Sequence, residues 1–139
     1  EGIPMNNEEK KQYLRRYQAA KKRAKMIQEE IDELRSSKTS PVGLGDGLPH
    51  GSGTSDLSGY AARWDELVRE LEAEKEMQMV TYREIRQQIG MVPDPTEQEI
   101  LSRRYLLEQR WEKISVEMNY DYRYVLKLHG KALLHFEVV

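Results

Sequence analysis

The sequence predicts an all-α protein in which a long antiparallel helical hairpin, of the coiled-coil type, precedes a three-helix helix-turn-helix domain. Composition is the first reason, since 33% of the 139 residues are charged, one is Phe and the mean hydropathy is −0.81. Such chains bury one stripe of each amphipathic helix more readily than they fill a sandwich or a barrel. The second reason is that apolar residues recur at alternating steps of three and four in two long segments. The third is a proline-containing break, after which three short helical segments follow.

The first long segment covers residues 7–36, which contain no Gly or Pro and are dense in residues that tolerate a helix. We expect one continuous helix here. Its apolar positions step by four and three, which is the spacing of a coiled-coil seam. These positions are Tyr13, Tyr17, Ala20, Ala24, Ile27, Ile31 and Leu34.

Residues 37–55 are rich in Gly, Ser, Thr and Pro and predict a flexible loop. A phosphate-binding loop is the alternative for a segment with this much glycine. That loop requires a Gly-Lys-Ser/Thr motif between a strand and a helix, and the segment has neither the motif nor a preceding strand. The segment is therefore predicted to be a connection.

The second long segment begins near Asp56, a candidate N-cap, and ends before Gly90, a candidate C-cap. A polar stretch around Lys75 and Gln78 interrupts its seam and predicts a stutter in the coiled coil. Two helices with matching seams and one flexible connection fold back most simply as an antiparallel hairpin, here residues 7–90. The seam residues of the second helix are Tyr60, Trp64, Leu67, Leu71, Tyr82, Ile85 and Ile89.

Two prolines, Pro93 and Pro95, mark the predicted domain boundary, because proline cannot continue a helix interior and restricts the residue before it. Directly after them, Thr96 is a candidate N-cap, and Glu99 three residues later would complete a capping box. A new helix is therefore expected to begin at this point.

The predicted C-terminal domain covers residues 96–137 and contains three helices, at 96–107, 111–118 and 121–137, separated by short turns. This is the spacing of a helix-turn-helix domain. The apolar stripes of the three helices are expected to pack as a small core. Its predicted members are Ile100, Leu101, Trp111, Ile114, Met118, Val125, Leu128, Ala132 and Phe136.

Three residues define the expected turn chemistry of this domain. Asn119 stands where the chain must adopt a left-handed conformation, which Asn tolerates, and Asp121 is suited to cap the last helix. Arg110 stands before the middle helix and is a poor cap, so the sequence defines the start of that helix less clearly.

The outward face of the last helix is basic and aromatic, which is typical of a DNA-recognition helix. Side chains of the first turn of such a helix reach base edges, where Arg commonly reads guanine, while later Lys side chains meet phosphates. The alternative is an ordinary solvated helix face that happens to be basic. The candidate DNA-binding residues are Tyr122, Arg123, Tyr124, Lys127 and Lys131.

The C-terminal motifs resemble a known family. The runs Arg-Tyr-Leu at 104–106, Trp-Glu-Lys-Ile-Ser-Val-Glu-Met at 111–118, Tyr-Asp-Tyr-Arg-Tyr-Val at 120–125 and His-Gly-Lys-Ala-Leu at 129–133 are similar to region four of bacterial sigma factors. With the hairpin and its glycine-rich loop, the chain resembles small phage-encoded regulators that act in late phage transcription. The resemblance implies double-stranded DNA and RNA polymerase as partners, and a place in the cytoplasm of a bacterial host cell.

Several classes of function lack the residues they need. The chain has no Cys, which excludes a disulfide scaffold, a thiolate zinc site and a cysteine nucleophile. No Ser–His arrangement or phosphate loop organises the carboxylates, so we expect no enzyme, no cofactor and no metal. No apolar run approaches the roughly 18 residues of a membrane span, so we expect no membrane association.

Two functions fit these expectations. The first is a sequence-reading, DNA-binding transcription regulator of phage origin that works with RNA polymerase, with the hairpin available for homo-oligomer formation or polymerase contact. The second is a non-catalytic protein-interaction module, whose hairpin binds polymerase, a host protein or a component of phage packaging. A gel shift at stated salt separates the two, because only the first requires direct contact with DNA.

Overall fold

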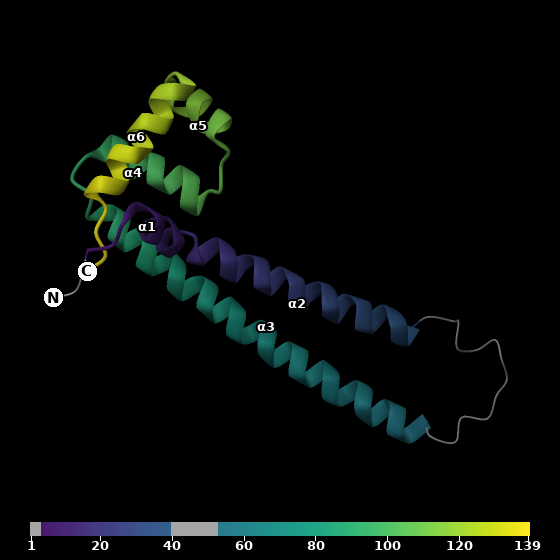
Figure 1. Cartoon of the computed structure of the whole chain (residues 1–139). Helices are drawn as coiled ribbons and strands as arrows, with labels where there is room; N and C mark the ends of the chain where they lie inside the picture. The colour runs from purple at the N-terminus through teal and green to yellow at the C-terminus, as the bar shows by residue number, and fades with distance from the viewer. Residues whose placement is uncertain (1–3, 40–52) are drawn as a thin grey trace. The chain divides into compact units, whose positions relative to one another are not determined.

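The computed structural model describes residues 4–39 and 53–139, without the side chains of 38, 39 and 53–57. Every regular element in this part of the chain is helical, which confirms the predicted all-α class (Figure 1). Figure 1 shows the two long helices side by side. The helices are α1 (Asn7–Leu14), α2 (Arg16–Thr39), α3 (Gly53–Gly90), α4 (Pro95–Leu101), the π-helix η2 (Ser102–Leu106), α5 (Trp111–Met118) and α6 (Tyr122–His135).

The contacts divide the chain into two packed units. The main unit combines the residues up to Ala20 with Met77–Val139, and the hairpin unit is Lys21–Glu76. These units differ from the expected domains at 7–90 and 96–137, because the first and last parts of the predicted hairpin pack with the C-terminal helices. That residues 96–137 form a domain of their own stays a prediction.

The hairpin unit contains antiparallel portions of α2 and α3. Arg23, early in α2, pairs with Glu74 of α3 at 3.0 Å, while Arg35, late in α2, lies 5.3 Å from the ring centre of Trp64. Predicted seam residues of both helices form its core. They are Ala24, Ile31, Leu67 and Leu71, with Ile27, Leu34 and Trp64 packed against them.

The two long helices are longer than the sequence predicts at the ends next to the predicted loop. Helix α2 continues to Thr39 and α3 begins at Gly53, so both helices extend into the range 37–55. Residues 40–52, where most of the predicted loop falls, lie outside the described residues, and so does the predicted capping side chain of Asp56.

The predicted stutter in α3 is wrong. Thr81 is 2% exposed and Tyr82 is 37% exposed, so the seam passes through Thr81 and keeps its heptad spacing from Leu71 by way of Glu74 and Gln78. The Thr81 hydroxyl donates to the carbonyl of Met77 at 2.7 Å, which satisfies its hydrogen bond inside the packed seam. Polar residues continue this seam, and a pattern of apolar residues alone does not show them.

The first long helix is interrupted, contrary to the single helix expected over residues 7–36. The break falls at Arg15, between α1 and α2, although the Arg15 amide still donates to the carbonyl of Lys11 at 2.9 Å. Leu14, directly before the break, is completely buried in the core of the main unit. The break thus accompanies burial of a residue outside the predicted seam.

The core of the main unit confirms the predicted C-terminal core and enlarges it. Leu14 of α1 and Ile85 and Ile89 of α3 join the apolar residues of α4, α5 and α6 in one cluster, with Trp111 and Met118 packed against it. The predicted members that it contains are Ile100, Leu101, Ile114, Val125, Leu128, Ala132 and Phe136.

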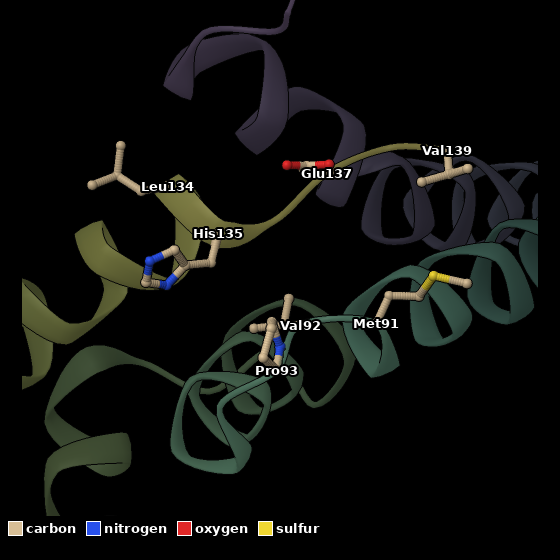
Figure 2. A pocket seen from close by; sticks show the side chains of 7 residues that line it. All are labelled: Met91, Val92, Pro93, Leu134, His135, Glu137 and Val139. Carbon is tan, nitrogen blue, oxygen red and sulfur yellow. The ribbon is translucent and has the colours of Figure 1, made fainter.

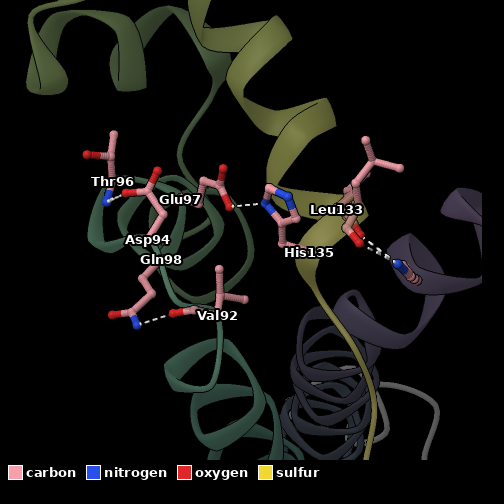
Figure 3. A network of polar contacts seen from close by, with 9 residues as sticks. Val92, Asp94, Thr96, Glu97, Gln98, Leu133 and His135 are labelled. Atoms are coloured by element: carbon pink, nitrogen blue, oxygen red, sulfur yellow. Dashed lines mark hydrogen bonds and ion pairs between the residues drawn. The ribbon is translucent and has the colours of Figure 1, made fainter.

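The start of α4 differs from the expected cap. Asp94 is the N-cap, and its carboxylate accepts from the Thr96 amide at 2.9 Å, as Figure 3 shows, while Pro95 takes the first helical position. The Gln98 side-chain nitrogen donates to the carbonyl of Gly90, the last residue of α3, and to that of Val92 in the bend. One side chain of α4 therefore ties the bend to the end of α3.

The helix expected over 96–107 changes type part-way. Its second half is the π-helix η2, and the chain leaves it through Glu108, which has a left-handed φ of 57°. Gln18 of α2 donates its side-chain nitrogen to the carbonyls of Arg104 and Tyr105, at 3.1 and 3.4 Å. A side chain from the first half of the sequence thus supports this segment.

Candidate nucleic-acid interface

A three-residue turn joins α5 to α6, and its geometry follows the predicted chemistry. Asn119 is left-handed, with φ 60° and ψ 43°, as expected. The Tyr120 amide donates to the carbonyl of Ser115 at 3.1 Å, and the Ser115 hydroxyl donates to the carbonyl of Tyr120. Two hydrogen bonds between Ser115 and Tyr120 therefore hold the turn against the second half of α5.

The two helix starts differ in the expected way. The Asp121 carboxylate accepts from the Arg123 amide at 3.1 Å, which confirms Asp121 as the N-cap of α6. Arg110 occupies the N-cap position of α5 and makes no capping hydrogen bond with its side chain. The stronger cap thus belongs to the helix that carries the candidate DNA-binding residues.

Three cations lie in a stripe along α6. Arg123, Lys127 and Lys131 are exposed and spaced by four residues, which places them on one face of the helix. Within the described part of the chain, none of the three forms an ion pair or a side-chain hydrogen bond. Leu134, 65% exposed and seven residues after Lys127, continues this stripe. We call Arg123, Lys127 and Lys131 the basic stripe.

The two candidate tyrosines lie on different sides of α6. Tyr124 is 48% exposed next to the basic stripe, and its ring meets Tyr120 edge to face at 5.0 Å between centroids. Tyr122 is 40% exposed but precedes the buried residues Val125 and His129 by three and seven positions, so it lies toward the packed side of the helix. The structure therefore brings four of the five candidates together and separates Tyr122 from them.

Buried aromatic contacts support the inner side of α6. His129 is 7% exposed, shares a 2.8 Å hydrogen bond between its Nε2 and the Tyr105 hydroxyl, and lies 4.6 Å from Trp111 between ring centroids. The guanidinium carbon of Arg104 also lies over the Trp111 ring, 4.4 Å from its centroid. Trp111 thus has the packing role that its stripe predicts.

Burial controls the protonation of this buried pair. Desolvation, reinforced by the positive charges of Lys11 and Arg104, lowers the pKa of His129 to about 4. Burial also raises the pKa of the Tyr105 hydroxyl above its ordinary value. At neutral pH both side chains are therefore uncharged, and their hydrogen bond joins two neutral groups.

The other end of α6 is held by partners from distant parts of the sequence. The Lys10 ammonium of α1 donates at 2.7 Å to the carbonyl of Leu133 in the last turn, which accepts a longer hydrogen bond of 3.3 Å from the Phe136 amide. His135 Nδ1 lies 2.7 Å from the carboxylate of Glu97, a residue that is 3% exposed (Figure 3). Sequence patterns did not identify Lys10 or Glu97, because their partners lie 123 and 38 residues away.

A mainly apolar hollow of about 360 Å³ lies at this same end of α6. Figure 2 shows Met91, Val92 and Pro93 on one side of it, with Leu134 and His135 on the other. His135 is already engaged with Glu97, and in the described residues no group of three or more His, Asp or Glu side chains could hold a metal ion. In the part of the chain that the structure describes, its lining includes the carboxylate of Glu137 but no Lys or Arg, so the hollow adds no cation to the basic stripe.

Comparisons with models of protein families, with curated proteins and with solved structures give no significant match for this chain. None of the described helices combines the length and the apolar character that crossing a membrane requires.

Proposed function

We propose that this protein is a phage-encoded, DNA-binding transcription regulator that works with RNA polymerase, and that α6 enters the major groove of double-stranded DNA. The observation that carries the proposal is the basic stripe. Three exposed cations without partners in the described structure follow the capped start of a helix whose opposite face is fully packed. Such a helix can give its charges to phosphates and its first turn to base edges.

The resemblance to region four of sigma factors supports the same proposal from the sequence. The turn at Asn119 and the cap at Asp121 have the local geometry that such a motif requires. Helix α5 would then brace the motif against the DNA backbone, as the first helix of a helix-turn-helix does. In this proposal, contact with polymerase places the protein at a promoter, and the hairpin unit is available for polymerase contact or homo-oligomer formation.

The test compares two cations of the basic stripe. Arg123 lies in the first turn of α6, so Arg123→Ala should cost about 1 to 3 kcal/mol on the preferred DNA site and reduce discrimination between sites. Lys127 lies one turn later, so Lys127→Ala should weaken binding to all sequences similarly and lower the salt slope by about one ion. Fluorescence anisotropy with selected and scrambled duplexes, at several salt concentrations, measures both effects.

A matched control separates the loss of a DNA contact at the basic stripe from the general effect of removing one positive charge. Lys22 is an exposed lysine of α2 without a partner in the described structure, and Lys22→Ala should leave DNA affinity unchanged. If Arg123→Ala and Lys127→Ala leave DNA binding intact while both weaken association with purified RNA polymerase, the DNA proposal is wrong. The protein-interaction module then takes its place.

A further inference from the structure

A second hollow, of about 580 Å³, lies between the last turns of α3 and the helical segment that follows the bend. Arg83 and Arg86 of α3 line one side of it, while Gln98 of α4 and Ser102 of η2 line the other. Among the described residues, none that lines this hollow carries a carboxylate, although the whole protein has a net charge of −2. We call it the arginine hollow.

The two arginines of the hollow have no partner in the described structure. Neither Arg83 nor Arg86 forms an ion pair, a hydrogen bond or a ring contact with the residues described. Two other arginines of the main unit do have partners, since Arg16 pairs with Glu84 at 3.1 Å and Arg103 with Glu99 at 2.8 Å. The positive charge of the hollow is therefore not compensated by an ion pair. Arg83 and Arg86 are three residues apart on α3, which places both side chains on one face of the helix.

Two of the residues that line the hollow, Gln98 and Tyr82, are held in place by contacts within the protein. Gln98 donates to the carbonyl of Val92 at 2.5 Å and to that of Gly90 at 3.2 Å, which ties α4 to the end of α3. At the rim, the Tyr82 ring is 37% exposed and is fixed edge to face against Tyr17, at 5.2 Å between centroids. Fixed walls reduce the entropy that a ligand must overcome on binding.

We propose that the arginine hollow binds the phosphate group of a small phosphorylated ligand. Guanidinium groups match the oxygens of a phosphate in paired, charge-assisted hydrogen bonds, and two of them suit a dianion better than the single charge of a carboxylate. The volume lies in the range of about 300 to 1,000 Å³ that small-molecule sites occupy. The exposed ring of Tyr82 offers a flat surface beside the phosphate position. This site shares no residue with the basic stripe and does not depend on the proposed function.

The test uses the full chain with labelled arginine side chains in NMR titrations. The probes are inorganic phosphate and adenosine 5′-monophosphate, with acetate and adenosine as controls for charge and for the base alone. We expect saturable shifts of the Arg83 and Arg86 Nε–H signals with the two phosphate probes and not with the controls. Arg83→Gln and Arg86→Gln should each weaken binding about tenfold or more, because each removes charge-assisted hydrogen bonds.

Two further variants make the test specific. Arg69 is an exposed arginine of the same helix outside the hollow, so Arg69→Gln changes the net charge equally and should leave the affinity within about twofold. Gly90 lines the hollow with open space around the position of a Cβ atom and no left-handed φ, so Gly90→Gln should fold normally. Its side chain should fill the hollow and weaken phosphate binding without a change of charge.

Three results would overturn the proposal. One is the absence of saturable shifts with both phosphate probes. Another is a loss of phosphate affinity in Arg69→Gln equal to that in Arg83→Gln and Arg86→Gln, which would show nonspecific charge attraction. The third is a response of Arg83 and Arg86 to duplex DNA alone, which would assign the arginines to the nucleic-acid backbone and not to a small ligand. A stronger response to adenosine 5′-monophosphate than to inorganic phosphate would support the proposal and extend it to the Tyr82 ring.

Discussion

His129 links the packing of α6 to pH through a single buried side chain. Its pKa is lowered from 6.5 to about 4, so between these values the unfolded chain binds a proton that the folded chain does not. Folding stability therefore falls as the pH falls through this interval. At roughly 1.4 kcal/mol per pH unit, the loss is about 3 kcal/mol. We expect urea unfolding to show this decrease in the free energy of unfolding between about pH 7 and pH 4.

The matched variant for this prediction is His129→Gln. Its amide can hydrogen-bond with the Tyr105 hydroxyl but does not titrate, so the variant keeps only the pH dependence that other groups cause. The free energy of unfolding of the unmodified chain minus that of the variant should therefore decrease by about 3 kcal/mol as the pH falls from about 7 to 4. Parallel curves would show that His129 does not cause the acid dependence.

Asp121 holds the start of α6 but brings a negative charge to the proposed DNA face. Asn caps a helix as well as Asp does, so Asp121→Asn should change the free energy of unfolding by less than about 1 kcal/mol. Removal of the charge should raise DNA affinity by about two- to fivefold at low salt, and this gain should diminish as salt is added. Anisotropy titrations measure the DNA affinity, and thermal unfolding of the same protein measures its stability. Asp121→Ala is the control, since it removes the charge and the cap together and should lose about 1 kcal/mol of stability.

An unchanged DNA affinity in Asp121→Asn would contradict the placement of the start of α6 against phosphates. In that case the basic stripe could still carry charge toward another partner. The comparison therefore tests how α6 approaches DNA separately from whether its cations bind.

At the scale of single elements, local chemistry predicted most of what the structure contains. The heptad spacing identified the seam residues Ala24 and Ile31 of α2, and turn chemistry identified the left-handed Asn119 and the capping Asp121. These features depend on residues a few positions apart. The backbone and side-chain preferences that decide them are therefore visible in any short window of sequence.

The features that sequence patterns missed have both distant and local causes. The π-helix η2 carries no local signature, and part of its support is the Gln18 side chain of α2. Thr81 occupies a seam position with a polar side chain that bonds its own helix, so a search for apolar residues shifted the seam to Tyr82. Four of the five candidate DNA-binding residues share a face of α6, as their spacing predicts. Tyr122 does not share it, because it lies on the same side of α6 as the buried Val125 and His129.

At the scale of the whole molecule, the main unit is assembled from both ends of the sequence. Leu14 and Ile85 lie far apart in the chain, yet both are fully buried with the apolar residues of α6. Lys10 adds a hydrogen bond to the last turn of that helix. The proposed DNA-binding helix is thus positioned by α1 and α3 as well as by its sequence neighbours α4 and α5, so part of the predicted hairpin belongs to the main unit.

Two shortened chains test this organisation. A fragment of residues 96–137 lacks Leu14, Ile85 and Ile89, each worth about 1.5 to 3 kcal/mol of apolar burial. A unit of this size has little stability in reserve, so the fragment should be largely unfolded in circular dichroism and should melt without a cooperative transition. A chain in which a short Gly/Ser linker replaces Lys21–Glu76 keeps the whole main unit and should melt cooperatively. Cooperative folding of the fragment would instead show that residues 96–137 are a domain in their own right, with α1 and α3 packed against an already stable core.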